Sequence, residues 1–388
     1  MKSPVGKNIV ILGSTGSIGK RTLDVIRELG EGWKVVGLAA GSNWQALARQ
    51  ARQFLPAEVV ISDERHYERL KDAVKDLPIK VSAGSAAVEN LAELPASDFV
   101  VCAIVGARSI LSVLRGIEAG KDIGLASKEA LVLAGKLVMS RAKAKGVNLL
   151  AVDSEHSAVF QAMQAGRHEE INRIVLTASG GPFRDWTQDT IYNATLKEAL
   201  NHPTWSMGKK ITIDSATMMN KALEIIEAHY LFDLPGDKIE VLIHPESIVH
   251  SLVEFCDGSV MGQFSVPDMA IPIQLALTWP QRRPCIGRAL NLAEIGQLNF
   301  YKPDFEKFPA LRLAYEVADR GGTAGAVFNA ANEQAVETFM AGNIKFGEIV
   351  EIIERVFQDH PWMENPSLDE LLQADQWARN EVNQCLQK

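Results

Sequence analysis

A glycine-rich turn follows the first apolar run of the chain, in the sequence Ile9-Val10-Ile11-Leu12-Gly13-Ser14-Thr15-Gly16-Ser17-Ile18-Gly19. The apolar run predicts a buried strand, and residues 20–29 after the turn predict a helix. A turn between a strand and a helix can hold a pyrophosphate, because glycines let the backbone approach it at the positive helix N-terminus. The spacing is G-x-x-G-x-x-G rather than G-x-G-x-x-G, so a generic glycine-rich turn is the alternative.

Strands and helices alternate through the first 150 residues. Apolar runs predict strands at residues 35–40, 59–61, 99–105 and 122–126. Apolar residues spaced along residues 44–54 predict a helix there. Such alternation implies a parallel sheet with helices on both faces. We therefore expect residues 1–150 to form a Rossmann-like nucleotide-binding domain.

Residues 151–286 differ in character and predict an α+β catalytic and dimerisation domain. Further strands are expected at residues 149–152, 174–178, 211–213, 240–243, 248–255 and 259–264, and a helix at residues 217–230. Asp257-Gly258 separates the last two strands and is a hairpin signal. The antiparallel part of such a sheet offers a surface on which two subunits can pair.

The last part of the chain predicts a helical bundle. Residues 287–305 lack periodicity and predict a linker, and residues 306–388 show helical patterns at 309–320, 323–340, 346–357 and 368–386. Gly321-Gly322 is expected to end the first helix, and Ser367 with Glu370 forms a capping box at the last. The expected fold class is therefore α/β, with an N-terminal parallel-sheet domain, a central α+β domain and a C-terminal helical domain.

Charge and composition exclude several classes of protein. The net charge of −8, without a Lys/Arg-rich run, argues against a nucleic-acid binder. No stretch is apolar enough to span a membrane, and the first apolar run is too short for a signal peptide. The four cysteines are scattered without a Cys-x-x-Cys pair, which fits neither a zinc site nor a disulfide framework. We expect a cytoplasmic protein with reduced thiols.

The end of the second strand bears on the choice of nucleotide. An acidic residue there would bond the ribose hydroxyls of NAD. The strand ends in Ala39-Ala40-Gly41-Ser42-Asn43, which has no carboxylate, so NADP(H) is favoured. No Arg or Lys stands there either.

Asp153 and Glu155 lie two residues apart directly after a predicted strand. Both side chains can therefore leave one side of an extended backbone. Two carboxylates suit Mg²⁺ or Mn²⁺ rather than zinc. The alternative is a helix start at which Asp153 or Ser154 is the N-cap, with His156 as a structural hydrogen-bonding group.

A second polar group lies on the helix that follows Asp214. Asn220 and Glu224 are four residues apart and share a face, with Lys221 beside them. An amide, an ammonium and a carboxylate can hold phosphate oxygens and a cation together. A solvated polar face is the alternative, but apolar neighbours predict a mostly buried helix, whose polar groups need partners. Ser215 is expected either to contact phosphate or to cap the helix.

Two loops complete the candidate site. Ser179-Gly180-Gly181-Pro182 ends a predicted strand, and it forms either an anion-binding nest or a plain turn. Residues 202–208 form a loop in which Trp205 either closes over a ligand or anchors the loop by packing.

Together these segments resemble the 1-deoxy-D-xylulose 5-phosphate reductoisomerase family, NADPH-dependent enzymes of the methylerythritol phosphate route to isoprenoids. The resemblance covers nearly the whole chain. It is carried by residues 13–19, 126–132, 153–156, 179–184, 202–208, 214–224, 267–269 and 329–333. It implies a homodimer that converts 1-deoxy-D-xylulose 5-phosphate, a phosphosugar, into 2-C-methyl-D-erythritol 4-phosphate with NADPH and Mn²⁺, Mg²⁺ or Co²⁺.

The resemblance also implies roles for individual residues. The metal ligands would be Asp153, Glu155 and Glu224, and these with Lys128 would form the catalytic group. Lys128, Ser154, Glu155 and Glu224 would contact the reacting end of the substrate, with Lys128 and Glu155 assisting proton movement. Its phosphate would be held by Ser179, Ser215, Asn220 and Lys221, with His202 nearby and Trp205 in a lid. The NADPH site would comprise Thr15, Gly16, Ser17, Ile18, Gly41, Ser42, Asn43, Ser127, Glu129 and Gly208.

Three departures from the family pattern concern the cofactor. The family often has Asn in place of Ser127, which shortens a cofactor contact, and some members have a basic residue in place of Ser42. Arg108 lies in a loop where small residues are common, and it is a candidate to compensate. The rival hypotheses are an ordinary NADP-linked dehydrogenase with a structural cation and a catalytically silent NADP-binding sensor.

Overall fold

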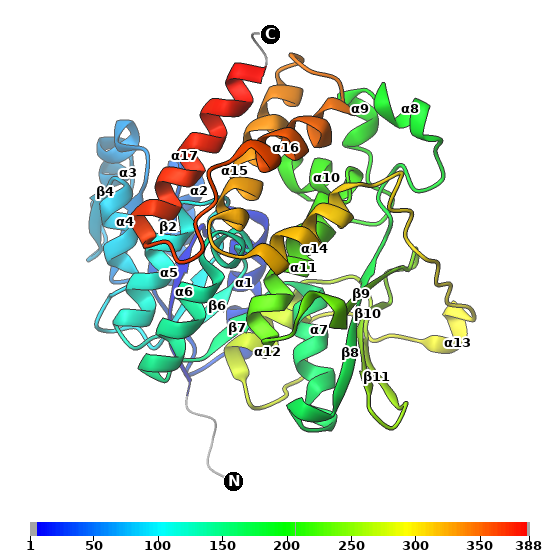
Figure 1. Ribbon diagram of the computed structural model, residues 1–388. Coiled ribbons are helices and arrows are strands. Elements are labelled where there is room, and N and C mark those ends of the chain that lie inside the picture. Colours follow the sequence, from blue (N-terminus) through cyan, green and yellow to red (C-terminus); the bar gives the residue numbers. More distant parts are fainter. Residues whose placement is uncertain (1–5, 206, 386–388) are drawn as a thin grey trace. The chain divides into compact units, whose positions relative to one another are not determined.

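The computed structural model describes residues 6–205 and 207–385, and by contact the chain forms two compact units (Figure 1). The first unit comprises Met1–Ala130, Val138–Ser154 and Asp268–Arg288. The second comprises Leu131–Leu137, Glu155–Pro267 and Ala289–Lys388. The units therefore do not follow one another along the chain, and the expected segments 151–286 and 306–388 fall largely in the same unit.

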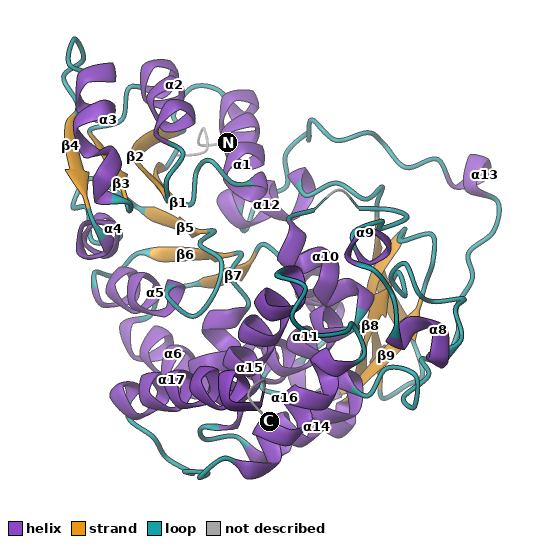
Figure 2. Ribbon diagram, turned by 90° about the horizontal axis from the view of Figure 1, so that it is seen from above, coloured by secondary structure: helices purple, strands orange, loops and turns teal. Residues whose placement is uncertain are grey.

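The first unit contains a parallel sheet of seven strands, shown in orange in Figure 2. In order across the sheet they are β4 (Lys80–Ala83), β3 (Glu58–Ile61), β2 (Lys34–Ala40), β1 (Asn8–Leu12), β5 (Phe99–Cys102), β6 (Asp122–Leu125) and β7 (Leu149–Ala151). The expected Rossmann-like sheet is confirmed. Its central strand is apolar because both faces are covered.

Three features of this sheet differ from the expectation. β4 was not anticipated, and β7 belongs to this sheet rather than to the second one. The strand expected at residues 99–105 ends at Cys102, and Val105 beyond it is 72% exposed. A short apolar run does not by itself show where hydrogen bonding to the neighbouring strands stops.

Helices cover both faces of the seven-stranded sheet, with α1 and α2 on one face and α4 and α5 on the other (Figure 2). The helices of this part are α1 (Ser17–Leu29), α2 (Trp44–Phe54), η1 (Glu64–His66), α3 (Tyr67–Ala73), α4 (Ser85–Leu91), α5 (Ser109–Glu118), α6 (Glu129–Lys145) and α12 (Ala270–Thr278). α12 packs against α1. Arg21 donates to both carboxylate oxygens of Asp268, at 3.0 and 2.5 Å, which fixes this returning segment.

The second unit contains a sheet of four strands. Their order is β11 (Val260–Phe264), β10 (Val249–Phe255), β8 (Ile171–Ala178) and β9 (Ile239–Ile243). β10 is antiparallel to β11 and β8, whereas β8 and β9 are parallel. The predicted hairpin is confirmed, with Gly258 in its turn at a φ of 83°.

The strand expected at residues 211–213 is wrong, because these residues lie in helix α10 (Lys209–Ala216). Ile211-Thr212-Ile213 has high strand propensity, but short apolar runs of this kind are ambiguous between strand and helix. The Thr212 hydroxyl donates to the carbonyl of Gly208 at 2.8 Å, as it does within a helix. Met218, at a φ of 60°, separates α10 from α11 (Met219–Phe232).

The other helices of the second unit include several that pack with its sheet around a single hydrophobic core. They are α7 (Ser154–Ala162), η2 (Met163–Ala165), η3 (His168–Glu170), α8 (Gln188–Tyr192), α9 (Leu196–Ala199), η4 (Gly236–Lys238), α13 (Leu292–Ile295), α14 (Ala310–Arg320), α15 (Ala324–Met340), α16 (Glu348–Asp359) and α17 (Leu368–Cys385). One hydrophobic cluster contains Ile174 of β8, Leu223 of α11 and Phe328 of α15. The C-terminal helices therefore share their core with the second sheet.

The signals at the helix ends are confirmed. Gly321 ends α14 at a φ of 57°, and Ser367 and Glu370 bond reciprocally before α17. The expected last residue of that helix, Leu386, lies outside the described residues. Within 6–205 and 207–385, each helix is either too short or too polar to cross a bilayer.

Candidate active site

The glycine turn after β1 is packed too closely for any residue but glycine at two positions. A Cβ atom on Gly13, whose φ is 89°, would lie 2.3 Å from the carbonyl oxygen of Ala103. A Cβ atom on Gly19 would lie 2.4 Å from the carbonyl oxygen of Gly13. The turn therefore lies against the segment after β5, where β2 and β5 flank β1 on either side. This reversal of strand order is where dinucleotides bind in such sheets.

Side-chain bonds fix the turn and leave its outer residues exposed. The Ser14 hydroxyl donates to Gln50 at 2.8 Å, and the Gln50 amide donates to the Ser14 carbonyl at 2.8 Å. Gly16, the N-cap of α1, offers no side chain, and the first turn of α1 has no acidic residue. The N-terminal N–H groups of α1 are thus left to bind an anion. Thr15, Gly16, Ser17 and Ile18 were predicted for this role.

The next three cofactor candidates follow β2, which pairs with β1. Gly41, Ser42 and Asn43 are exposed. The Asn43 side chain accepts the N–H of Ala46 at 3.1 Å, so it caps α2. Its place beside the turn fits the prediction, but its side-chain oxygen already has a structural partner.

Ser127 and Glu129 flank the start of α6, and both are buried. The Ser127 hydroxyl lies 2.5 Å from the carbonyl of Ile104 and 3.2 Å from that of Cys102. It therefore joins the ends of β5 and β6. Burial raises the pKa of the neighbouring Cys102 thiol to about 11, so this cysteine is unreactive.

Sequence reasoning missed the segment after β5 as part of this region. Ala103 contacts the glycine turn, and the exposed Val105 lies just beyond it. The signal in the sequence was the apolar Val105 shortly after the end of β5, which could have indicated a contact surface for a ligand. The loop also contains Arg108, which directly precedes α5.

Lys128 and Asp153 meet where β6 and β7 end. The two strands are neighbours in the sheet, and the Lys128 Nζ lies 2.7 Å from the Asp153 Oδ2. Both side chains are largely buried, with 7% and 14% of their surface exposed. A buried ammonium beside a carboxylate is a pair that can hold and move a proton.

Three carboxylates come together around the start of α7. One oxygen each of Asp153, Glu155 and Glu224 lies within 4.8 Å of the others. Asp153 precedes α7 and Glu155 is in its first turn, while Glu224 is in α11. Carboxylates this close repel one another unless a cation is near. An all-oxygen donor set of this kind fits Mg²⁺ or Mn²⁺.

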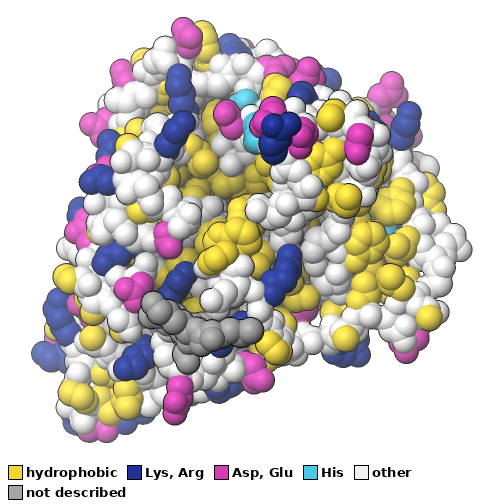
Figure 3. All heavy atoms as spheres, turned by 90° about the horizontal axis from the view of Figure 1, so that it is seen from below, with side chains coloured by type: hydrophobic (Ala, Val, Ile, Leu, Met, Phe, Trp, Pro, Cys, Tyr) yellow, Lys and Arg dark blue, Asp and Glu magenta, His cyan; other side chains and the backbone are white. Residues whose placement is uncertain are grey.

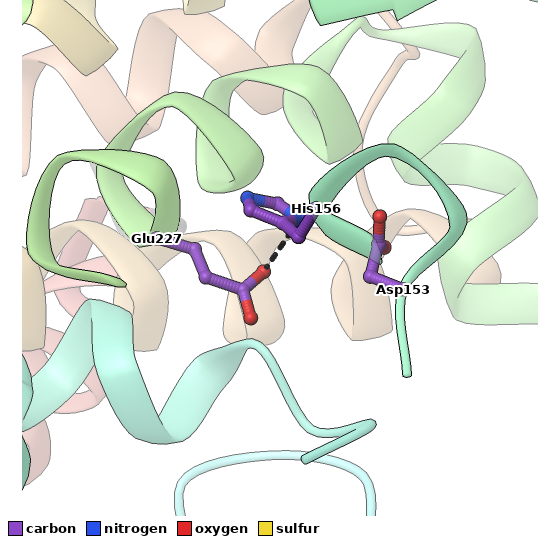
Figure 4. A group of neighbouring side chains, drawn as sticks. All are labelled: Asp153, His156 and Glu227. Atoms are coloured by element: carbon purple, nitrogen blue, oxygen red, sulfur yellow. Dashed lines mark ion pairs between the residues drawn. The ribbon is translucent and has the colours of Figure 1, made fainter. Parts of the chain in front are cut away.

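His156 joins α7 to α11, and Figure 4 shows its ion pair with Glu227 of α11. Its Nε2 lies 3.0 Å from the carbonyl of Glu224, and its Nδ1 lies 3.4 Å from Glu227 Oε2. A carbonyl only accepts, so Nε2 carries the proton of this bond. Asp153, His156 and Glu227 form a second cluster of possible ligands. Because both His156 nitrogens already face protein groups, the imidazole holds α7 on α11.

Two of the predicted polar residues of α11, Lys221 and Glu224, are buried, and Asn220 is partly buried. Lys221 is 4% exposed and Glu224 is 1% exposed. The Asn220 amide donates to Glu224 Oε1 at 2.5 Å, and the Lys221 ammonium contacts Glu224 Oε2. The alternative of a solvated polar face is therefore wrong. Asn220 and Lys221 are donors that lie directly beside a candidate metal ligand.

The Ser179 turn is bonded to the loop at residues 202–208. The Nδ1 of His202 accepts the N–H groups of Thr204 and Trp205 at 3.1 and 2.9 Å. The proton of a neutral ring is therefore on Nε2, which lies 3.1 Å from the Ser179 hydroxyl. Burial lowers the pKa of His202, which favours this neutral form. Trp205 is in this loop, whose residue 206 lies outside the described part of the chain.

Ser179 and Ser215 are brought together by a close approach of two backbones. A Cβ atom on Gly181, whose φ is 66°, would lie 2.5 Å from the carbonyl oxygen of Ser215. The N–H of Gly181 donates to the Ser179 hydroxyl at 3.2 Å. Since this hydroxyl accepts from Gly181 and His202, its own proton can be donated to an anion. Gly208, the last cofactor candidate, is the N-cap of α10.

Models of one protein family match three segments of the chain. A model of 1-deoxy-D-xylulose 5-phosphate reductoisomerase matches residues 9–135, and models of C-terminal domains of that enzyme match residues 149–232 and 264–381. The reductoisomerase of Pelodictyon phaeoclathratiforme is 49% identical over 96% of this chain and 98% of its own. That of Exiguobacterium sibiricum is 50% identical, over 96% and 97%.

Solved structures agree with this comparison. The Zymomonas mobilis reductoisomerase in complex with NADPH has a TM-score of 0.93 and 39% identity, covering 99% of this chain and 100% of that one. A reductoisomerase in complex with NADPH, fosmidomycin and magnesium also has a TM-score of 0.93, with 40% identity over 98% of each chain. The chain belongs to the 1-deoxy-D-xylulose 5-phosphate reductoisomerase family.

Proposed function

We propose that this chain converts 1-deoxy-D-xylulose 5-phosphate into 2-C-methyl-D-erythritol 4-phosphate with NADPH and a divalent metal, a step of isoprenoid precursor biosynthesis. Family membership and the NADPH- and magnesium-bound relatives support this function. The observation that carries it is the cluster of Asp153, Glu155 and Glu224, with the donors Asn220 and Lys221 directly beside it. One site then offers ligands for a cation and for a phosphate.

NADPH is assigned to the carboxyl end of the parallel sheet. The backbone N–H groups of Thr15, Ser17 and Ile18 would bind the pyrophosphate at the start of α1. Gly16 would lie against it without a side chain, because its own N–H donates to the carbonyl of Gly13 at 3.1 Å. The rest of the NADPH site would be lined by the other six candidates, Gly41, Ser42, Asn43, Ser127, Glu129 and Gly208. At Asn43 and Ser127 we expect backbone rather than side-chain contacts, because their side-chain oxygens are hydrogen-bonded within the protein.

The metal is assigned to Asp153, Glu155 and Glu224. Mg²⁺, Mn²⁺ and Co²⁺ all accept carboxylate oxygens, and we propose that Mn²⁺ supports turnover as Mg²⁺ does. When bound, the ion supplies Lewis-acid stabilisation of negative charge on neighbouring substrate oxygens. These three carboxylates, of which Glu224 is buried and the other two are partly buried, would hold the ion, and His156 keeps α7 and α11 together beside them.

The remaining polar residues orient the substrate and move its protons. The Lys128 ammonium, 2.7 Å from Asp153, is placed to hold a proton near a substrate hydroxyl, and Glu155 is the proposed acceptor. Ser154 contacts the same end of the substrate. Ser179, Ser215, Asn220 and Lys221 bind its phosphate, and His202 holds Ser179 in the donating orientation. Phosphate binding far from the reacting carbons can orient them and drive closure of the loop that carries Trp205.

The edge of the second sheet supports a homodimer. β11 is the outer strand, and its Val260, Met261 and Phe264 are 51%, 43% and 43% exposed. An exposed apolar edge strand is a template for pairing with another chain. Met261→Glu should shift the protein from dimer to monomer in sedimentation, whereas Leu55→Glu, at a comparably exposed apolar residue of the first unit, should not. A dimer that persists with Met261→Glu would place the interface elsewhere.

We further propose a cytoplasmic protein that does not bind nucleic acid. All four cysteines are free, as expected in a reducing compartment. On the face drawn in Figure 3, Lys and Arg side chains are interspersed with Asp and Glu and form no continuous basic patch. The net charge of −8 adds to this argument.

NADPH oxidation with 1-deoxy-D-xylulose 5-phosphate, with and without Mg²⁺ or Mn²⁺, tests the function. Metal-dependent oxidation that yields a branched polyol phosphate, identified by NMR, is the expected result. Reduction without a skeletal change would favour the ordinary dehydrogenase. NADPH binding without turnover would favour the silent sensor.

A further inference from the structure

Two buried amides on α15 are not used by the proposed function. Asn329 and Asn332 are both 0% exposed and lie one helical turn apart. The Asn332 Nδ2 donates to Asp214 Oδ1 at 3.1 Å. The Asn329 Nδ2 donates to Glu333 Oε1, also at 3.1 Å, within the same helix. Of these two amides, only Asn332 is hydrogen-bonded to α10.

Asp214 is a buried carboxylate with a partner on each oxygen. It is 1% exposed, and its Oδ2 lies 2.7 Å from the Nζ of Lys210, one turn earlier in α10. Its Oδ1 accepts from Asn332. A buried charge is tolerated only when its hydrogen-bonding capacity is met. The hydrogen bonds of Asp214 are thus complete only when α10 lies within bonding distance of Asn332 on α15.

The position of α10 sets the spacing of two predicted phosphate contacts. Ser215 directly follows Asp214, and its carbonyl oxygen lies so close to Gly181 that a Cβ there would be 2.5 Å away. A shift of α10 would therefore move both Ser215 and the turn that carries Ser179. α10 has only eight residues, and a helix of that length depends on tertiary contacts for its position.

We propose that Asn332 is a positioning residue for substrate phosphate, acting through Asp214 and α10. This inference rests on the proposed function, in which Ser179 and Ser215 bind the phosphate. It gives the C-terminal helices a part in substrate affinity, although Asn332 itself touches neither substrate nor cofactor. The competing explanation is that apolar packing of Ile213 and Ala216, both 0% exposed, positions α10 alone and that Asn332 contributes only stability.

Asn332→Leu and its matched control Asn329→Leu separate these explanations. Both changes replace a fully buried amide of α15 with an apolar side chain of the same branching and number of heavy atoms, and both are expected to lower the melting temperature. Asn332→Leu should raise the KM for 1-deoxy-D-xylulose 5-phosphate about tenfold, the factor expected when a hydrogen bond to a charged group is lost. The kcat and the KM for NADPH should stay within about twofold, as should all constants of Asn329→Leu.

Equal changes in the two variants, or a fall in kcat without a rise in KM, would overturn the proposal. Should Asn332→Leu not fold, Asp214→Asn takes its place, because it weakens both bonds of the carboxylate without a change in volume. Asp214→Asn should also raise the KM for the substrate, and an unchanged KM would reject the role of this pair.

Binding of inorganic phosphate, followed by ³¹P NMR line broadening, tests the inference without turnover. The wild-type protein and Asn329→Leu should broaden the phosphate signal alike, and Asn332→Leu should do so only at higher phosphate concentration. If the wild-type protein binds phosphate but does not turn over 1-deoxy-D-xylulose 5-phosphate, the proposed function fails and this inference does not. Equal phosphate binding by all three proteins would overturn the inference.

Discussion

The imidazole Nε2 of His202 lies 3.1 Å from the hydroxyl of Ser179, and this contact sets the direction of the serine proton. The other ring nitrogen accepts two backbone N–H groups, so the neutral ring donates to Ser179. Ser179 then presents its own proton outward. The His202 ring can in this way influence how well Ser179 binds the phosphate that we propose for this site.

His202→Leu should raise the KM for the phosphorylated substrate about tenfold, because Ser179 loses the donor that orients it. Steady-state kinetics at saturating NADPH measures this change. His360→Leu is the control, since His360 is a buried histidine whose Nδ1 is bonded to the carbonyl of Phe357 and which lies outside the proposed phosphate site. A similar KM in wild type and His202→Leu would exclude this role for the ring.

Stability should fall on acidification through the ordinary range of histidine titration. Burial lowers the pKa of His202 and of His360 below the usual 6.5. The unfolded chain therefore takes up protons first as the pH falls through 6.5, which favours unfolding until the lower folded-state pKa is passed. Urea unfolding at a series of pH values checks this. The double variant His202→Gln/His360→Gln should lose less stability between neutral and mildly acidic pH, and an unchanged slope would contradict the prediction.

Glu224→Gln should lower metal-dependent turnover about a hundredfold or more, because a neutral amide replaces a buried carboxylate ligand. NADPH binding, followed by fluorescence titration, should be largely unchanged. Glu316→Gln, at an exposed carboxylate paired with Arg312 on α14, is the control. Normal turnover of Glu224→Gln would remove Glu224 from the metal site.

Lys221→Ala should chiefly raise the KM for the phosphorylated substrate, since the buried ammonium is a proposed phosphate donor. Comparison of KM and kcat with those of Lys302→Ala, a change at an exposed lysine, measures the effect. An unaltered KM would argue against a phosphate contact at this position.

Phosphate should strengthen metal binding. In the structure the donors Asn220 and Lys221 occupy the oxygens of Glu224, which is also a proposed metal ligand. When they turn to a phosphate, Glu224 becomes available to the cation, so each ligand should raise the affinity for the other. Mn²⁺ binding measured by electron paramagnetic resonance, with and without inorganic phosphate, tests this coupling.

Lys221→Ala should weaken this coupling between phosphate and Mn²⁺ binding. Glu224→Gln, which lacks a proposed metal ligand, is the control for association of Mn²⁺ with phosphate in solution. An equal Mn²⁺ affinity of the wild-type protein with and without phosphate would show that the two sites are independent.

Five of the seven strands of the first unit, β1, β2, β3, β5 and β6, could be placed in its sheet from the sequence, because they depend on local patterns, whereas β4 was missed and β7 was expected in the second sheet. The run Ile9–Leu12 is apolar throughout, as a strand covered on both faces must be. The glycines at 13 and 19 fit a turn that no larger residue could occupy. By contrast, the run Ile211–Ile213 was assigned to a strand, because short apolar runs carry no reliable period.

The site was only partly predictable from spacing. Asp153 and Glu155 were compatible with either a helix start or a metal site, and the resemblance to a family favoured the metal site. In the structure, Asp153 directly precedes α7 and its oxygen also meets those of Glu155 and Glu224. A place at the start of a helix and membership of the carboxylate cluster are therefore compatible for Asp153. A residue before a helix can still direct its carboxylate to a partner on another helix.

Local sequence patterns predicted the parallel sheet, the glycine turn after β1 and the residue types of the proposed metal and phosphate sites. These features follow from hydrophobic period, glycine geometry and ligand chemistry, all of which act over a few neighbouring residues. The folded structure was needed to show that an oxygen of Glu224 lies near one of Glu155, that Asn332 bonds to Asp214 and that the Ser127 hydroxyl is bonded to the protein backbone. Such pairings depend on how α7 packs on α11 and α15 on α10, and no local spacing encodes contacts between residues so far apart in the chain.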